Sequence, residues 1–565
     1  MSLRRDIHAK IHANTKSRGV FLFLLCSLLI LAFVLPTWII PIPYGTDVYG
    51  HLFMTRMLSS VNSLSRFYTY CFEEGYLTYD YPFGLWLFGS IVAKITGMDM
   101  LELSRILPFA VMLILITLYF SYARVFTSSG DEALLSVVFL LSIPLMCSDV
   151  VAYQTRTIVM PFLIFIIYFI LIEEKISLWK RTLLINVFIF ILCFTHTGTY
   201  MFLLMLTIAY LFVYAILCGE LHRDSYIATG SLMFFYIITM HLFPHVHPQY
   251  IDKGRILVSA GDFLTSDLHV PFADELAKMF YDEIFLDLNP LYVVLICLAI
   301  YAACRFLMFL HHKIKASGIK LKLSEKFLSV PILGSIRHVS HSITYTPFWL
   351  GPVHVVLAIS GIFKVNRKGL CMLFAVAAVT ILSGYMSGER GTREIGYFFV
   401  IIPVLAALGF YHAKAKVEPH MKGIFQKFFA GMLLLGVFLS VVVLPVIANI
   451  YYRPLISGPE YERTGLSWLS GIGMPDEGCA GLGYRHMISV YGNKIPPSVT
   501  TVAHGSESRH FNTDQYSVCF NMNSEKHADD LYATFGVKYL IVSKRTIRNF
   551  GEKPEHLMID HNRQL

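Results

Sequence analysis

An aspartate and a histidine near residue 50 have the types and the spacing that a catalytic site could use. Asp47 and His51 are four residues apart in the stretch D-V-Y-G-H, so a helix would place both on one face. The Asp47 carboxylate could accept a proton from an attacking hydroxyl group, or bind Mg²⁺ or Mn²⁺ through oxygen. The alternative is that Asp47 only caps a helix that starts at Val48. Asp47 is therefore a candidate catalytic residue and metal ligand, and His51 a candidate substrate-binding residue.

A second group of charged residues, in the stretch Y-M-S-G-E-R-G-T-R-E, contains Glu389, Arg390, Arg393 and Glu394. Arginine keeps its charge and offers paired donors that match the oxygens of a phosphate. Arg390 and Arg393 are candidates for binding a substrate phosphate and stabilising it as a leaving group, with Glu389 in the same site. The alternative is that the two glutamates pair with the arginines beside a membrane span. Arg156 is a third candidate cation.

These residues are set in a strongly apolar chain. Of its 565 residues, 55% are hydrophobic and only 15% are charged, whereas soluble domains carry about 25% charged residues. Apolar runs of about 18 residues recur, and each could cross about 30 Å of hydrocarbon. We predict a polytopic, mainly α transmembrane helix bundle, which excludes soluble, disordered and fibrous classes. The net charge of +8 comes from short loops between apolar runs, so no nucleic-acid partner is expected.

The distribution of basic and acidic residues predicts how the chain is organised across the membrane. Residues 1–18 are basic and are expected in the cytoplasm, and residues 19–450 form the transmembrane domain. Two segments, 43–80 and 244–289, are expected as external loops. Residues 451–565 have the composition of a small soluble α/β domain outside the membrane, and contain an expected strand, V-K-Y-L-I-V-S.

Counting the spans raises a problem of parity. The clear spans alone would leave two basic loops, 364–369 and 412–422, on the external face. One more crossing, over 327–346, returns both loops to the cytoplasm and gives about 13 spans. A short apolar piece, 82–95, is expected to lie at the interface. The other expected spans are 20–40, 104–126, 133–147, 158–172, 182–195, 199–218, 225–243, 290–310, 347–363, 370–386, 396–411 and 425–450.

Several short motifs resemble one known family. The stretch from Asp47 to Leu52 is similar to the Asp-Pro-Tyr-Tyr-His-Leu signature in the first external loop of archaeal oligosaccharyltransferase catalytic subunits. Residues 81–84, Y-P-F-G, resemble the Tyr-Pro-x-Gly before that family's next membrane segment. In the tail, residues 483–488 and 535–542 resemble stretches of the family's soluble domain. The chain thus resembles a divergent member of this family, within the membrane glycosyltransferases of the GT-C fold.

The resemblance implies an integral-membrane, inverting glycosyltransferase. Its donor would be a sugar or glycan on a polyprenyl (dolichyl-type) phosphate or pyrophosphate, entering from the membrane lipids. Its acceptor would be a protein, glycan or lipid at the outer or lumenal face. Asp47 would act as base or hold a divalent cation, and the arginines would hold the donor phosphate. Tyr484, in the tail, would help to bind substrate.

The chain departs from the family at the acceptor motif. Where the family has Trp-Trp-Asp-Tyr-Gly, which reads an Asn-x-Ser/Thr acceptor, residues 479–483 are C-A-G-L-G. Residues 154–160 also supply no second metal-binding acid. These departures favour transfer to a different acceptor. The alternatives are an asparagine-linked oligosaccharyltransferase and a non-enzymatic transporter or flippase of lipid-linked glycans. A transporter or flippase would need charges within the spans, and internal repeats would support it.

Overall fold

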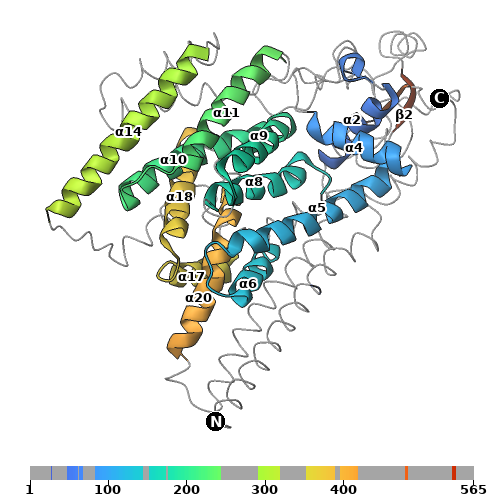
Figure 1. The fold of residues 1–565 in the computed structure, drawn as a ribbon. Coiled ribbons are helices and arrows are strands. Elements are labelled where there is room, and N and C mark those ends of the chain that lie inside the picture. Colours follow the sequence, from blue (N-terminus) through green and yellow to red (C-terminus); the bar gives the residue numbers. More distant parts are fainter. Residues whose placement is uncertain are drawn as a thin grey trace, which may run out of the picture. The chain divides into compact units, whose positions relative to one another are not determined.

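A computed structural model of the chain describes part of residues 1–565, shown as ribbon in Figure 1. The chain divides into two units. Unit 1 comprises Met1–Ile40, Pro108–Val151 and Thr155–Asn449, and unit 2 comprises Pro41–Leu107, Ala152–Gln154 and Ile450–Leu565. The described residues are 27, 47–61, 63–67, 83–143, 152–172, 176–242, 290–317, 351–387, 395–417, 478–481 and 537–541.

Helices dominate the described residues. Every expected span that falls within the described residues contains a helix. The spans expected at 20–40 (apart from Ser27), 327–346 and 425–450 lie outside the described residues. The helices at the other expected spans are α5 (Met100–Ala123), α6 (Gly130–Leu141), α8 (Thr155–Leu171), α9 (Leu178–Thr195), α10 (Thr197–Cys218), α11 (Arg223–Leu242), α14 (Pro290–Ala316), α17 (Pro352–Gly361), α18 (Arg367–Ser387) and α20 (Ile402–Val417).

Four of the described helices, α5, α9, α10 and α14, are long and apolar enough to cross a bilayer. The chain is therefore an integral membrane protein. The short piece expected at the interface is α4 (Gly84–Thr96), whose 13 residues extend only about 20 Å. One expected span differs in form, because residues 396–411 begin with a 3₁₀ helix, η4 (Ile395–Val400), before α20 starts.

Local sequence signals explain several helix ends. At the start of α6, the Ser129 hydroxyl accepts the backbone N–H of Glu132, and the Glu132 carboxylate accepts the backbone N–H of Ser129. A single residue, His196, separates α9 from α10 and caps α10 by accepting the backbone N–H of Thr199. Gly219 ends α10 with a φ of 74°, in the left-handed region that glycine tolerates best.

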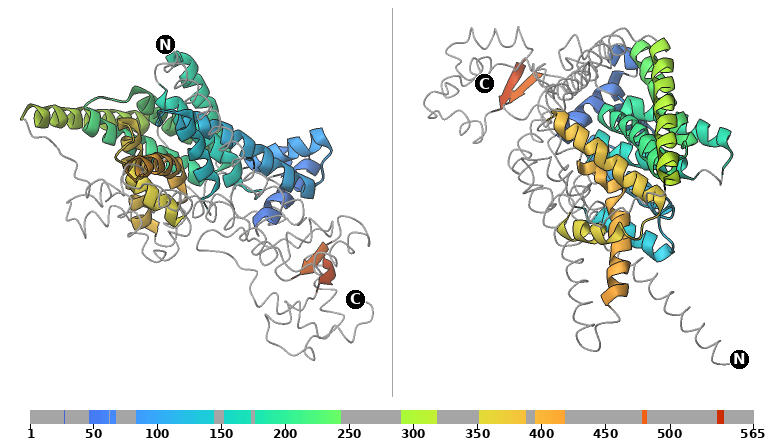
Figure 2. Two further views of the ribbon diagram at one scale, coloured as in Figure 1. Left: turned by 90° about the horizontal axis from the view of Figure 1, so that it is seen from below. Right: turned by 90° about the vertical axis from the view of Figure 1, so that its left-hand side faces the viewer.

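Helix α10 is central to unit 1, where it packs against α8, α9, α11, α14 and α18. A second group is formed by α6, α17 and α20, with α20 in contact with both α6 and α17. His354 of α17 is fully buried, and its Nε2 atom lies 2.7 Å from the Ser142 hydroxyl at the end of α6. Helix α14 lies at the outer side of unit 1, beside α10 and α11 (Figures 1 and 2).

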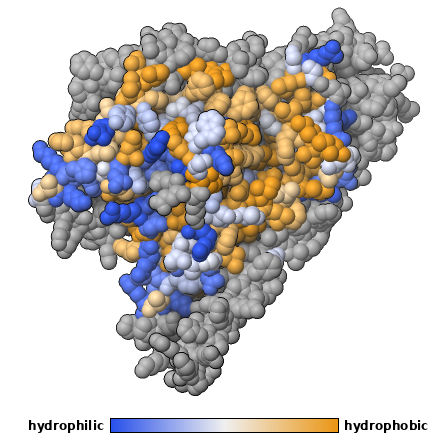
Figure 3. Space-filling model, viewed as in Figure 1, coloured by the Kyte–Doolittle hydropathy of each residue, from blue (hydrophilic) through white to orange (hydrophobic). Residues whose placement is uncertain are grey.

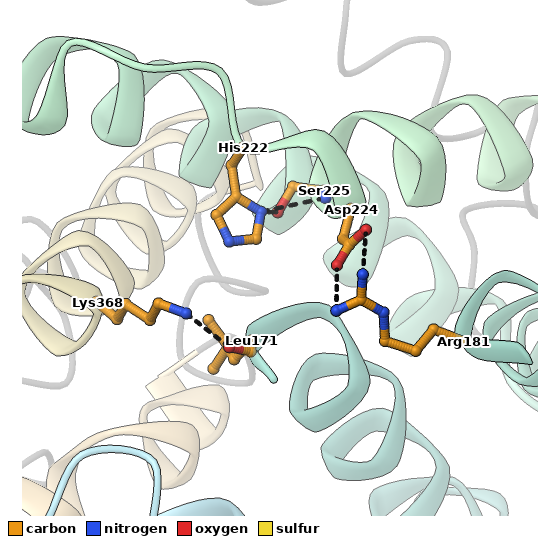
Figure 4. Close-up of polar contacts among 6 residues, drawn as sticks. All are labelled: Leu171, Arg181, His222, Asp224, Ser225 and Lys368. Atoms are coloured by element: carbon orange, nitrogen blue, oxygen red, sulfur yellow. Dashed lines mark hydrogen bonds and ion pairs between the residues drawn. The ribbon is translucent and has the colours of Figure 1, made fainter. Parts of the chain in front are cut away.

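At one end of unit 1, polar contacts join loops that the sequence predicts to be cytoplasmic; Figure 4 shows the contact of Lys368 with Leu171. The Lys368 ammonium donates to the carbonyl of Leu171, at the end of α8, over 2.8 Å. The Asn366 amide donates over 2.9 Å to the carbonyl of Val125, just after α5. These contacts place the loop 364–369 at the same end as the loops after α5 and α8. The predicted topology of about 13 spans places these three loops on the same face of the membrane.

A buried ion pair closes the same end of unit 1. The Arg181 Nη1 and Asp224 Oδ2 atoms are 3.0 Å apart, and Nη2 donates to Oδ1 over 3.4 Å. Only 6% and 4% of the two side chains are exposed. Asp224 lies in the first turn of α11, where the helix dipole also favours a negative charge. The pair therefore joins the start of α9 to the start of α11.

Replacing Asp224 with asparagine is expected to destabilise the protein strongly. The substitution keeps the size of the side chain but leaves the buried Arg181 cation without its countercharge, which costs about 3–5 kcal/mol in comparable cases. We expect a clearly lower midpoint of thermal unfolding in detergent. Glu220→Gln is the matched control, because Glu220 is exposed and lies in the same turn region. Equal midpoints for the two variants would show that the ion pair does not stabilise this end.

The start of unit 2 contains α2 (Asp47–Val61) and α4, which pack against each other. Its tail contains two parallel strands, β1 (Gly478–Gly481) and β2 (Val537–Ile541). Strand β2 confirms the strand expected from V-K-Y-L-I-V-S. The sequence did not predict β1, which includes Cys479 and Ala480 of the altered acceptor motif and pairs Cys479 with Tyr539.

Candidate functional site

The predicted catalytic helix is present. Helix α2 begins at Asp47 and includes His51, so the backbone places the two residues one turn apart on the same face. Asp47 therefore lies in the first turn of a helix, where the dipole stabilises a carboxylate. The Asp47 side chain is outside the described part of the structure, so its roles as base and metal ligand stay predictions.

His51 is held by a residue that the sequence analysis did not identify. The indole N–H of Trp86, on α4, donates to Nδ1 of His51 over 3.1 Å. An indole can only donate, so Nδ1 carries no proton and the neutral ring carries its proton on Nε2. Trp86 is itself almost fully buried, with Phe67 edge-on at a ring distance of 5.8 Å. The orientation and the tautomer of His51 are thus set by α4.

A second contact fixes α2 in unit 2. The Tyr153 and Thr55 hydroxyls are hydrogen-bonded over 2.8 Å in a buried position. Gly89 on α4 makes room for this contact, because a Cβ atom there would lie 2.0 Å from the Tyr153 oxygen. Thr55 also donates to the carbonyl of His51 over 2.7 Å. The helix that carries Asp47 is therefore fixed by side chains from two other segments of unit 2.

Arg156, in unit 1, lies beside an aromatic ring that is itself held by polar contacts. It lies in the first turn of α8, and its guanidinium carbon is 5.3 Å from the centre of the Tyr397 ring on η4. The Tyr397 ring stacks on Phe202 of α10, with ring centres 3.8 Å apart and planes 9° from parallel. The Tyr397 hydroxyl is 2.9 Å from that of Thr199.

The donor and acceptor of each hydrogen bond between Tyr397, Thr199 and His196 can be assigned. Nδ1 of His196 accepts the backbone N–H of Thr199, so it carries no proton. The Thr199 hydroxyl, 2.8 Å from this nitrogen, therefore donates to it and accepts the hydroxyl proton of Tyr397. His196 is therefore a hydrogen-bonded polar residue at the break between α9 and α10. These hydrogen bonds hold the Tyr397 ring, over which the Arg156 guanidinium lies.

The 3₁₀ helix that carries Tyr397 is anchored from a second direction. The buried Tyr119 hydroxyl of α5 donates to the carbonyl of Phe399 over 2.9 Å. This bond satisfies a carbonyl of η4 and holds the segment that follows the arginine group. Among the predicted residues, Arg393 is four positions before Tyr397, so their Cα atoms are at most about 14 Å apart even in an extended chain.

The remaining predicted site residues, Glu389, Arg390, Arg393 and Tyr484, lie outside the described residues. Their roles stay predictions. Within the described ranges, no group of three or more His, Cys, Asp or Glu side chains is arranged to hold a metal ion. The Asp47 side chain is not among those described, so its role as a ligand of Mg²⁺ or Mn²⁺ stays a prediction.

The sequence analysis missed Trp86, Tyr153, Thr199 and Tyr397 as supporting residues. Of these, Thr199 carried a weak signal, because it stands three residues after His196, a polar residue within an apolar run. Trp86 and Tyr153 carried none that distinguishes them from other aromatic residues in apolar runs.

Comparison with solved structures supports the expected fold. The chain is similar to the crystal structure of the Archaeoglobus fulgidus oligosaccharyltransferase in complex with zinc and sulfate, with a TM-score of 0.53 and 12% identity. The match covers 91% of this chain and 67% of the other. A second match, ArnT from Cupriavidus metallidurans bound to undecaprenyl phosphate, has a TM-score of 0.41 and 12% identity, and covers 91% and 95% of the two chains.

No family model and no curated protein matches this sequence. The similarity to the oligosaccharyltransferase is one of fold, and the predicted GT-C fold is thereby confirmed.

Proposed function

We propose that this GT-C protein is a glycosyltransferase that moves a sugar or glycan from a polyprenyl-linked phosphate or pyrophosphate to an acceptor at the external membrane face. The observation that carries the proposal is how Arg156 is positioned: its guanidinium lies over the Tyr397 ring, and hydrogen bonds through Thr199 hold that ring. A cation in the first turn of a helix has the wrong sign for the helix dipole. A bound anion would interact favourably with both the guanidinium and the positive end of the helix dipole at this helix start.

The chemistry of a polyprenyl phosphate fits such a site. Its leaving group is a phosphate at the membrane surface, and a guanidinium binds phosphate through paired, charge-assisted hydrogen bonds. In this proposal Arg156, Arg390 and Arg393 bind the donor phosphate and stabilise the charge that grows on it, with Glu389 beside them. The short chain distance from Arg393 to Tyr397 supports a shared role for these arginines.

Asp47 acts in this proposal as the general base. Its carboxylate accepts the proton of an acceptor hydroxyl, whose oxygen attacks the anomeric carbon of the sugar. The bond from that carbon to the phosphate oxygen breaks, and the configuration at the carbon inverts. His51 donates its Nε2–H to the bound substrate, and Tyr484 contributes to binding from the tail. Asp47 as a Mg²⁺ or Mn²⁺ ligand is the alternative role from the sequence.

Replacing Arg156 with glutamine is expected to weaken donor binding. The loss of a charge-assisted contact to phosphate should lower kcat/KM for the polyprenyl-phosphate donor about 10- to 100-fold, through a higher KM and, because the leaving phosphate is less well stabilised, a lower kcat. Tyr397→Leu removes the supporting ring and should raise KM in the same direction by about tenfold or less. Steady-state kinetics over a series of donor concentrations measures both effects.

The matched control is Arg124→Gln, which removes an exposed arginine at the other end of unit 1. We expect it to leave KM unchanged. An unchanged donor KM in Arg156→Gln would remove Arg156 from the phosphate site.

The direct test of the function is an assay of the purified full chain with a panel of polyprenyl-linked sugars. Acceptors with free hydroxyl groups and an Asn-x-Thr peptide are offered in parallel, with and without Mn²⁺. Transfer to a hydroxyl acceptor is the expected result, because residues 479–483 lack the family's Trp-Trp-Asp. Transfer to the peptide would instead support the asparagine-linked oligosaccharyltransferase.

A further inference from the structure

The outer face of α14 carries an alternating stripe of aromatic and basic residues. Tyr301, Arg305, Phe309 and Lys313 follow one another at intervals of four residues, so a helix places them along one side. All four are exposed, with Tyr301 at 40% and Phe309 at 59%. Figure 3 shows hydrophilic colour at the lower-left end of unit 1, where α14 ends.

The side of α14 that packs begins about 100° around the helix from the stripe, at the residues that directly precede Tyr301 and Arg305. Ile300 and Cys304 are buried against Leu211 and Ala215 of α10. Only 11% of the apolar window of α14 is buried, whereas 39–44% is buried in the other three long apolar helices. The Tyr301 ring lies edge-on to Tyr226 of α11, with ring centres 6.1 Å apart, and the exposed remainder of the stripe faces away from the helices of unit 1.

Arg305 is an unusual residue for such a face. It lies within the apolar span Val294–Ala316, six residues, or about 9 Å along the helix axis, before His311. His311 itself contacts the carbonyl of Ile216, in the last turn of α10, over 2.7 Å. A charge on the lipid-facing side of a membrane helix is costly unless it reaches an anion or the interface.

Lys313 brings a second cation toward Arg305. Its ammonium lies 6.0 Å from the centre of the Phe309 ring, so the side chain turns back along the helix by one turn. Arg305 and Lys313 therefore flank Phe309, with Cα atoms about 12 Å apart along the axis. No acidic side chain occurs in α14 to neutralise either cation.

We propose that the stripe on α14 binds the headgroup of an anionic phospholipid. Arg305 and Lys313 supply the charge for one phosphate, while Tyr301 and Phe309 lie against the glycerol region and the acyl chains. Charge complementarity selects an anion as the occupant. The surrounding exposed apolar residues, among them Phe306 at 60% exposed, select one with hydrocarbon chains rather than a soluble anion. This site is independent of the proposed transferase function.

The test is native mass spectrometry of the full chain in detergent, titrated with phosphatidylglycerol or with phosphatidylcholine of the same acyl chains. Wild type is expected to bind phosphatidylglycerol more tightly. Arg305→Leu and Lys313→Gln should each weaken this binding about fivefold, from the usual contribution of one basic residue at an anionic membrane surface. Binding of phosphatidylcholine should not change.

Lys315→Gln is the matched control, because Lys315 is exposed on the same helix but two residues, or about 200°, around it from Lys313. It should bind phosphatidylglycerol like wild type, and Arg305→Lys should retain the preference. Leucine suits a lipid-facing position, so Arg305→Leu is expected to fold; Lys313→Gln tests the same site if it does not. Equal binding of the two lipids by wild type would overturn the proposal. Unchanged phosphatidylglycerol binding in both variants would also overturn it. So would a protein that copurifies with wild type and is lost from Arg305→Leu, because the stripe would then bind that protein.

Discussion

Replacing Asp47 with asparagine is expected to reduce sugar transfer about 10²- to 10⁴-fold. The change keeps the size of the side chain and removes the carboxylate that would take the proton of the acceptor, and general-base catalysis contributes about this factor. The initial rate of transfer from a saturating polyprenyl-linked donor measures the effect. Binding of the donor should change much less, because its phosphate is assigned to the arginines.

This substitution also separates catalysis from helix capping. Asparagine caps a helix about as well as aspartate, so a residue that only capped α2 would tolerate the change. Glu220→Gln provides the control, since it removes an exposed carboxylate at the other predicted face. Full activity of Asp47→Asn at a rate equal to that of Glu220→Gln would exclude Asp47 as the base.

Replacing Gly409 with alanine is expected to disrupt the contact between α17 and α20. The two helices meet through a pair of glycines, since a Cβ atom on Gly409 would lie 1.8 Å from the carbonyl oxygen of Leu357. A Cβ atom on Gly361 would lie 1.8 Å from the carbonyl oxygen of Leu405. Both obstacles are backbone atoms, so the helices would have to separate.

The sign of this effect is informative. Alanine is favoured over glycine within a helix by about 1 kcal/mol, so local propensity alone would stabilise Gly409→Ala. The packing cost should exceed about 3 kcal/mol, the upper part of the usual range for overpacking. We expect a large fall in the midpoint of thermal unfolding in detergent. Gly130→Ala, at the start of α6 with no atom near its added Cβ, is the control and should be neutral or slightly stabilising. Equal stability of both variants would contradict the close helix contact.

The elements of this fold were largely readable from the sequence, because apolar length decides where a membrane helix can form. Helix α14 starts at Pro290, as expected, and α10 ends at Cys218, as expected. The division of residues 396–411 into a 3₁₀ and an α segment was not readable. It depends on a distant partner, the Tyr119 hydroxyl that binds the carbonyl of Phe399.

The support of the candidate site was less predictable for the same reason. His51 and Trp86 are 35 residues apart, and Thr55 and Tyr153 are 98 apart. Local pattern carries no information about such pairs. Arg156 was identified by its charge, whereas Tyr397, in the run I-G-Y-F-F-V, looked like any aromatic residue that packs in a span. Charge stands out in an apolar sequence, but an aromatic support for that charge does not.

The central claim is that the protein transfers the sugar rather than moving its lipid carrier across the membrane. The most direct measurement uses the full chain in vesicles with a labelled polyprenyl-phosphate sugar and a water-soluble hydroxyl acceptor. The label is followed both in the acceptor and in its distribution between the two leaflets. The account predicts labelled acceptor that depends on the protein and is lost with Asp47→Asn. Protein-dependent movement of the intact donor between leaflets, with no label in any acceptor, would contradict it.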